Sequence, residues 1–509
     1  MHNSRFLICS KNAKLDWTMN MKRILGICVL CVGASLTTSA QNNEFEKAYN
    51  AFRQQAIKEY EDFREKANKE YADFMRQAWK SYQSLPEIPK PKDEPPVPPT
   101  PYPKDDKDKP IKDTPKPYEE VIPITEPEPQ PKPIAPIREQ SQPEENYFRF
   151  TFFQTECKVR LDESRRFALK DCQMNTLAEV WERLAGNEYN NAIRDCLELR
   201  IRHRLCDWGY LLMLQELSDA YLGRETNESA LLCAYLYCQS GYQMRLGLGN
   251  NRLYLLVASK HQIYESGYWE IDGMFYYPFN CQEQSLEICS ASFPNEQPLS
   301  LLVNESPLLV EKPTGPRALQ SEHFPIAKAE ITSDENLVSF FATYPTSMLD
   351  GNFCTRWSFY ANTPMSERMK KQLYPSLQRA IKEKSQHEAA NILLNFVQTA
   401  FVYEYDDKVW GGDRAFFAEE SLYYPYCDCE DRSILFSRLV RDLLRLKVLL
   451  VYYPGHLATA VHFTESVSGD YISLNNLKYV VCDPTYIGAP VGATMPDMDN
   501  SKAKVILLN

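Results

Sequence analysis

Residues 423–440 read YYPYCDCEDRSILFSRLV, where two cysteines stand one residue apart inside a cluster of acidic side chains. Apolar residues then recur with the spacing of one helix face, which predicts a helix from about residue 430 to 446. The buried side of this helix would consist of Ile434, Leu435, Leu439, Val440, Leu443 and Leu444. Cys429 stands at the helix start, where free backbone N–H groups and the helix dipole favour a thiolate. Cys429 is therefore a candidate nucleophile, and Cys427 gains less from the helix.

A thiol nucleophile needs a base within hydrogen-bond reach and a group that orients the base. Downstream of the cysteines the sequence contains two histidines, His456 and His462, both in the predicted strand HLATAVHF. Alternate residues of a strand share a face, so this spacing does not separate the two. His456 follows Pro454 and Gly455 at the strand edge, where catalytic side chains tend to lie. We expect His456 to be the base, with His462 as the alternative.

The orienting acid is expected to be Asp483, which ends the strand KYVVCDPT before Pro484. Structural roles are open for each of these residues. Asp483 could cap a turn, and Cys427 or Cys429 could form a disulfide, for example with Cys482. The acids that follow Cys429 would favour the helix start but would raise the thiol pKa. For the oxyanion, the candidates are the backbone N–H of Cys429 and the side chains of Gln398 and Trp410.

Three segments, DCEDRSILFSRLVRDLL (428–444), YPGHLATAV (453–461) and YVVCDPTYIG (479–488), resemble the transglutaminase-like superfamily, including its bacterial cysteine-proteinase branch. The preceding NILLNFVQTAFVYEYDD (391–407) is similar to the segment ahead of the family's cysteine motif. The resemblance covers roughly residues 376 to 495. It implies a papain-like core with a catalytic triad of Cys429, His456 and Asp483. The chain departs from the family at Cys427, where glycine is usual, and after His456, where an aromatic residue is common.

This resemblance implies thiol acyl transfer to a peptide or protein substrate, without a cofactor or a metal. Water as the acceptor would give a peptidase or amidase, and an amine would give a crosslinking enzyme. The alternative is a non-catalytic binding or scaffold protein of the cell envelope that carries a degenerate papain-like domain.

An export signal is predicted near the N-terminus in MKRILGICVLCVGASLTTSAQ, residues 21–41. Two basic residues precede a short apolar core, and small residues before Gln41 form a cleavage site after Ala40. The core is too short to span a bilayer. We therefore expect residues 1–20 to be an upstream extension and 21–40 a signal peptide. The mature chain would be exported to the periplasm, cell surface or medium without a transmembrane span.

Residues 41–84 contain an 11-residue repeat, and residues 85–146 are rich in proline. Tyr recurs at 49, 60, 71 and 82, and Phe at 52, 63 and 74. A period of 11 keeps these residues on one face of a nearly straight amphipathic helix. The helix could pack on its own chain, self-associate or dock onto an envelope partner. The proline-rich stretch is expected to be an extended spacer that isolates this helix.

The remaining sequence predicts an α+β protein with a central mixed helix and strand domain at 147–295. A β-containing connector follows at 296–375, and the transglutaminase-like domain is expected at 376–509. A formal net charge of −11 disfavours a broad nucleic-acid surface. Twelve of the 15 cysteines would remain after signal cleavage, and their irregular spacing makes disulfides optional. No pair of CxxC motifs indicates a structural zinc site.

Overall fold

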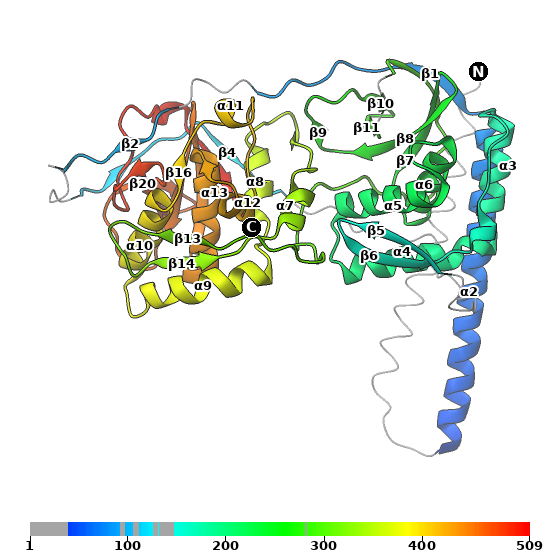
Figure 1. The fold of residues 1–509 in the computed structure, drawn as a ribbon, viewed down its shortest axis with the longest axis horizontal. Coiled ribbons are helices and arrows are strands. Elements are labelled where there is room, and N and C mark those ends of the chain that lie inside the picture. Colours follow the sequence, from blue (N-terminus) through cyan, green and yellow to red (C-terminus); the bar gives the residue numbers. More distant parts are fainter. Residues whose placement is uncertain are drawn as a thin grey trace. The chain divides into compact units, whose positions relative to one another are not determined.

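The computed structural model describes residues 39–91, 97–104, 111–125, 131, 147–279, 281 and 283–509 (Figure 1). The upstream extension and the signal peptide as far as residue 38 lie outside the described residues, as do several stretches of the proline-rich segment. The chain divides into two compact units, the first ending at Phe63 and the second beginning at Arg64. It mixes helices with strands, so the predicted α+β class is confirmed.

Helix α2 (Ser39–Met75) contains the repeats and passes through the boundary between the two units. In the first unit, Tyr60 and Phe63 are more than one third exposed, with their rings 6.3 Å apart. In the second unit, the Arg64 guanidinium donates to Tyr235, and Tyr71 packs 4.6 Å from the Trp181 ring. The last turns of the helix therefore pack on their own chain.

The prediction of a helix through residue 84 is wrong after Met75. Strand β1 (Trp79–Gln83) follows, and it pairs antiparallel with β12 (Ser285–Cys289). Tyr82, which continues the 11-residue period, therefore lies in a strand. Its neighbours include Trp79, and aromatic residues fit a pleated surface well when a partner strand is available. Tertiary pairing decides the conformation here, and the repeat does not.

The central region combines a hairpin, four helices and a six-stranded sheet. The hairpin is β5 (Tyr147–Phe152) and β6 (Thr155–Arg160). The helices are α3 (Met174–Leu184), α4 (Asn190–Arg202), α5 (Asp207–Leu222) and α6 (Asn227–Gln239). The sheet has the order β1-β12-β7-β8-β11-β10, with β7 (Met244–Gly249), β8 (Arg252–Ser259), β11 (Met274–Pro278) and β10 (Trp269–Ile271). Helix α6 packs on β8.

The predicted connector contains strands, as expected, and also helices. It comprises β13 (Arg317–Gln320), β14 (Lys328–Ile331), α7 (Glu335–Phe341), β15 (Ser347–Met348) and α8 (Thr355–Asn362). Strand β15 pairs with β9 (Gln262–Ile263). Helix α9 (Glu367–Ile381) begins before the predicted boundary at 376, and α10 (Gln386–Thr399) follows. Ser385 and Glu388 form a reciprocal cap that starts α10.

The C-terminal region is built on a seven-stranded sheet in the order β3-β20-β21-β19-β18-β23-β4. Its middle consists of β18 (Lys447–Tyr453), β19 (His456–His462), β21 (Leu477–Cys482), β20 (Asp470–Leu474) and β23 (Lys504–Leu507). Helix α13 (Cys429–Leu439) packs on β19 and continues as a π-helix, Val440–Leu444, so the predicted helix is largely observed. The shorter elements are β16 (Val402–Tyr403), α11 (Asp406–Val409), α12 (Ala418–Tyr423), β17 (Tyr426–Cys427) and β22 (Tyr486–Ile487).

The proline-rich segment is extended, but it is not an isolated spacer. Its strands β3 (Thr114–Pro115) and β4 (Glu120–Ile122) pair in parallel with β20 and β23 and form the two edges of the C-terminal sheet (Figure 1). A third strand, β2 (Thr100–Pro101), pairs with β22. Proline is tolerated at these edges because an edge strand needs few backbone donors. The prediction that this segment separates the helix from the rest is therefore wrong.

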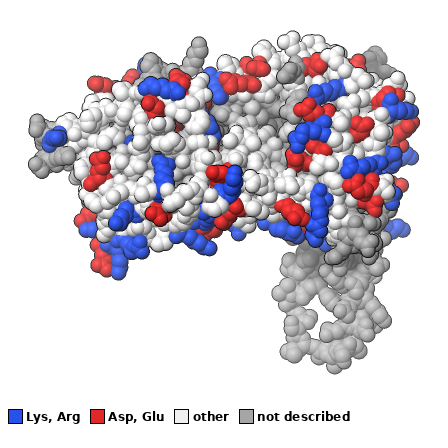
Figure 2. Space-filling model, viewed as in Figure 1, with Lys and Arg blue, Asp and Glu red and all other residues white. Residues whose placement is uncertain are grey.

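Charged side chains are interspersed over the described part of the face shown in Figure 2, without an extended patch of one sign. Among the described residues, no helix combines the length and the apolar character that a membrane span requires.

Candidate functional site

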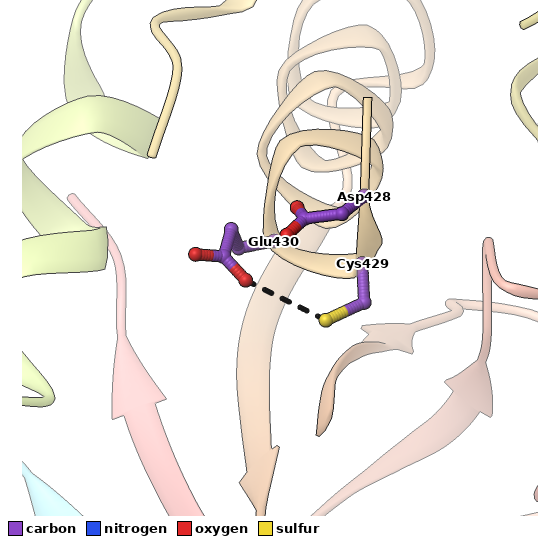
Figure 3. Close-up of side chains that lie close together, drawn as sticks. All are labelled: Asp428, Cys429 and Glu430. Carbon is purple, nitrogen blue, oxygen red and sulfur yellow. Dashed lines mark hydrogen bonds between the residues drawn. The ribbon is translucent and has the colours of Figure 1, made fainter. Parts of the chain in front are cut away.

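Cys429 is the first residue of α13, and its side chain is 6% exposed. The thiol donates to Glu430 Oε2 at 3.5 Å, and Figure 3 shows the two groups pointing toward one another at the helix start. The backbone N–H of Leu457, on the neighbouring strand β19, also interacts with this sulfur. The packing of α13 on β19 thus places the thiol beside the residue that follows His456.

His456 and Asp483 form a hydrogen-bonded pair, as the sequence predicted. His456 opens β19, and its Nε2 lies 2.9 Å from Asp483 Oδ2. The other carboxylate oxygen of Asp483 accepts the backbone N–H groups of Thr485 at 2.8 Å and Tyr486 at 3.2 Å. Because Pro484 turns the chain directly after β21, these N–H groups face back toward the carboxylate. Asp483 can therefore orient the imidazole while its own orientation is fixed.

The structure does not join Cys429 to His456 by a hydrogen bond. His456 Nδ1 is buried and has no hydrogen-bond partner among the described residues. Because Asp483 engages Nε2, Nδ1 is the nitrogen that remains to receive a proton from a thiol. His462 has a different environment, since its Nδ1 lies 3.0 Å from the backbone oxygen of Lys478. The hydrogen-bond partner of His462 is thus a backbone carbonyl, whereas the partner of His456 is the carboxylate of Asp483.

Burial raises the pKa of the Cys429 thiol well above its ordinary value, and the carboxylates of Asp428 and Glu430 raise it further. The Leu457 N–H acts in the opposite direction. The sequence pattern predicted a thiolate favoured by the helix start. In this closed arrangement the desolvation and the neighbouring acids outweigh the helix dipole and disfavour the thiolate. A base must remove its proton before it can attack.

A cluster of buried carboxylates surrounds the start of α13, and the sequence patterns considered above did not predict it. Oxygen atoms of Asp406, Asp413 and Glu430 lie within 4.8 Å of one another, as do oxygens of Asp406, Asp428 and Asp431. The sequence signal for it was the acidic stretch 404–413, which shares no motif with the cysteine segment. Carboxylate oxygens are the ligands that hard divalent cations prefer. These residues could hold such an ion.

Burial raises the pKa values of Asp428, Glu430 and Asp431 well above their ordinary range, and repulsion among the acids adds to the effect. One oxygen of Asp428 and one of Glu430 are buried without a hydrogen-bond partner among the described residues. The guanidinium of Arg356 binds Asp413 and partly offsets the negative charge at Glu430. Arg356 therefore does not fully balance the negative charge of the acidic side chains in this cluster.

A cavity of about 720 Å³ adjoins this cluster. Asp428, Trp410 and Tyr405 contribute to its wall. Asp428 directly precedes Cys429 in the chain, but the residues that line the cavity do not include Cys429, His456 or Asp483. Its wall also includes Lys90 and Pro91 from the proline-rich segment.

Of the predicted oxyanion candidates, Trp410 lines this cavity, and Gln398 has a structural role instead. Gln398 Nε2 donates to the carbonyls of Asp483 at 3.0 Å, Tyr486 at 2.8 Å and Ala489 at 3.1 Å. Its Oε1 accepts the Gly488 N–H at 3.1 Å. The side chain holds the loop after β21, and with it the position of Asp483.

Replacing Gln398 with leucine should therefore destabilise the protein by about 3 kcal/mol, because buried carbonyls lose their donor. Denaturant unfolding would measure this change. The exposed Gln320, whose amide makes one bond to Pro325, provides the control, and Gln320→Leu should change stability by less than about 0.5 kcal/mol. Equal effects of the two substitutions would contradict the structural role of Gln398.

Cys427 lies in β17 and is buried, and burial raises the pKa of its thiol to about 11. All 12 cysteines that the structure describes are free thiols. The disulfide alternatives among Cys427, Cys429 and Cys482 are therefore not formed in this structure.

No family model, curated protein or solved structure matches the chain. The geometry of the site and the resemblance of its three segments are the features that bear on function.

Proposed function

We propose that this chain is an exported thiol acyl-transfer enzyme of the transglutaminase-like class, acting as a peptidase or amidase on a peptide or protein. The observation that carries the proposal is the 2.9 Å pair of His456 and Asp483, whose strand also contacts the Cys429 thiol through Leu457. A base held by a carboxylate beside a helix-start thiol is the arrangement that covalent acyl transfer requires. Export is proposed from the predicted signal peptide at residues 21–40.

In the proposed reaction, His456 Nδ1 takes the proton of Cys429 Sγ while the sulfur attacks a carbonyl carbon. Asp483 keeps the other ring proton on Nε2 and stabilises the imidazolium that forms. His456 then returns the proton to the departing amine, which leaves an acyl thioester on Cys429. Water or an amine attacks the thioester, the acyl group leaves, and the sulfur regains its proton. The backbone N–H of Cys429 and the side chain of Trp410, which lines the cavity, are the remaining candidates for stabilising the oxyanion.

The rival proposal is a non-catalytic binding module with a degenerate papain-like domain. It is favoured by the burial of Cys429 and by the raised pKa of its thiol. The two proposals differ in whether a covalent acyl-enzyme can form.

Trapping with peptides that carry an electrophilic acyl group tests the proposed function. The protein should form a covalent adduct at Cys429, which peptide mass mapping would locate. Cys429→Ala should form none, whereas Cys427→Ala, which removes the neighbouring thiol, should retain the adduct. Adducts spread over several cysteines, or no adduct with any peptide of a diverse library, would support the non-catalytic alternative.

A further inference from the structure

The proline-rich segment contacts the rim of the candidate site beside the His456–Asp483 pair. The Val97 N–H donates at 3.0 Å to the carbonyl of Gly455, the residue directly before His456. The Tyr102 N–H donates at 2.8 Å to the carbonyl of Ile487 in β22, four residues after Asp483. The segment thus bonds to the backbone directly before His456 and to the loop that follows Asp483.

Side-chain packing reinforces these backbone bonds. The Tyr102 ring meets the Tyr486 ring edge to face, with centroids 5.3 Å apart. Val97 and Tyr102 pack against a small apolar cluster that includes Ala489 and Met495. The side chains on this rim can therefore distinguish apolar and aromatic residues of a bound chain.

The candidate site is closed in this structure. Cys429 is 6% exposed, and His456 and Asp483 are each 2% exposed. Attack on a polypeptide carbonyl requires that the thiol and the base be reached from outside. Lys90 and Pro91 line the cavity next to Asp428, and Val97 lies at Gly455. Described parts of one segment therefore line the cavity beside Asp428 and bond to the backbone directly before His456.

Residues 97–104, VPPTPYPK, resemble a peptide bound by strand addition, in which backbone bonds provide affinity and side-chain pockets provide specificity. Four of these residues are prolines, which lack an N–H. Of the other four, Val97 and Tyr102 donate their N–H groups to the rim, and Thr100 pairs with Tyr486 in the ladder of β2 and β22. Proline also restricts the backbone, so the segment loses little conformational entropy on binding. Few secondary amides are present for the thiol to attack, which suits an occupant that remains uncut.

We propose that the rim formed by Gly455 and β22 binds the extended backbone of the substrate peptide, and that residues 97–102 occupy it as an internal competitor. The substrate class is then an extended peptide that places an apolar or aromatic side chain against Tyr486. This inference rests on the proposed function, because it assigns the substrate-binding edge of the same site. Displacement of the segment would open the site.

The double substitution Val97→Pro, Tyr102→Pro in the full chain tests this proposal, because it removes both N–H donors and suits a proline-rich backbone. Alkylation of Cys429 by iodoacetamide, followed by peptide mass mapping, should become at least about tenfold faster than in the wild type, as expected from the loss of two backbone hydrogen bonds. Glu87→Pro is the matched control, since Glu87 is exposed and its N–H takes part in neither bond. It should label at the wild-type rate.

Cys482 is fully buried on β21 and reports on unfolding in the same experiment. Its alkylation should stay slow in the double variant, which would exclude general opening of the domain. A synthetic VPPTPYPK peptide at millimolar concentration should restore slow labelling of Cys429. Unchanged labelling of Cys429 in a folded double variant, or no protection by the peptide, would overturn the proposal.

Alkylation of Cys429 tests the internal competitor, and acyl-adduct formation tests the proposed function, so the two proposals can fail independently. If the double variant exposes Cys429 but still forms no acyl adduct, the rim binds the segment and the catalytic proposal fails. If the wild type forms the adduct and the double variant shows no faster alkylation of Cys429, the catalytic proposal is supported. The proposal that residues 97–102 are an internal competitor is then wrong.

Discussion

Replacing His456 with alanine should reduce the rate of acyl-adduct formation at Cys429 by about 10³-fold or more, as for loss of a triad member in other enzymes. Burial raises the pKa of the Cys429 thiol, and His456 offers a buried Nδ1, without a partner among the described residues, that can take its proton. No second histidine in the described structure is paired with a carboxylate in this way. The rate of adduct formation with an electrophilic peptide, measured by mass spectrometry, checks the prediction.

His462→Ala is the matched control, because His462 lies on the same strand and bonds to the carbonyl of Lys478. This variant should keep the wild-type rate within about twofold, since His462 is only half-buried and lies at the far end of β19 from the His456–Asp483 pair. Loss of the adduct in His462→Ala but not in His456→Ala would show that the base is assigned to the wrong histidine. Asp483→Asn should also strongly reduce the rate of adduct formation, as His456→Ala does, because the amide favours the wrong imidazole tautomer.

Glu430→Gln should stabilise the protein at pH 7 to 8 and should flatten the dependence of its stability on pH. Burial and the neighbouring acids raise the pKa of Glu430 in the folded state. The folded chain then holds a proton more tightly than the unfolded chain does. Its stabilising contribution is fully present below the ordinary glutamate pKa and is lost as the pH rises through the folded-state value.

The same direction holds for Asp428 and Asp431, so the unfolding free energy should fall as the pH rises above about 4, the ordinary carboxyl range. Each proton that the folded chain holds and the unfolded chain has lost lowers the unfolding free energy by up to about 1.4 kcal/mol per pH unit. Thermal unfolding from pH 4 to 8 in the presence of EDTA measures the slope with no divalent cation bound. Glu179→Gln, at an exposed position on α3, should leave the slope unchanged.

Glu430→Gln should also lower the pKa of the Cys429 thiol, because the carboxylate raises that pKa by its charge and as a hydrogen-bond acceptor. Alkylation of Cys429 would therefore reach half of its maximal rate at a lower pH. A steeper loss of stability with pH in Glu430→Gln, or a higher thiol pKa, would contradict this account of the acidic cluster.

The sequence predicted the His456–Asp483 pair because its signals are local. A strand that opens after Pro454–Gly455 and a strand that stops at Pro484 place both side chains at the same end of neighbouring strands. The start of α13 was also predictable from helical spacing. The acidic cluster was not, because Asp406 and Asp413 come from a loop whose approach to α13 depends on tertiary packing.

The proline-rich segment and the end of α2 were predicted incorrectly because their conformations depend on distant partner strands. Prolines give no strand signal, yet β3 and β4 pair at sheet edges where few donors are needed. The 11-residue period extends through Tyr82, but a partner strand is available there and the backbone becomes extended. In both places a distant segment determines the conformation, and no window of local sequence contains that information.

The edge strands β3 and β4 also affect how the protein folds during synthesis. Asp113 and Gly469 are joined by a hydrogen bond across 356 positions of the chain. The segment that closes both sides of the C-terminal sheet is thus made long before the strands it pairs with, and closing so long a loop slows folding. A fragment that begins at residue 147 would expose two bare sheet edges, which favour intermolecular strand pairing. Soluble recovery should therefore depend on keeping residues 111–125 attached to the C-terminal half.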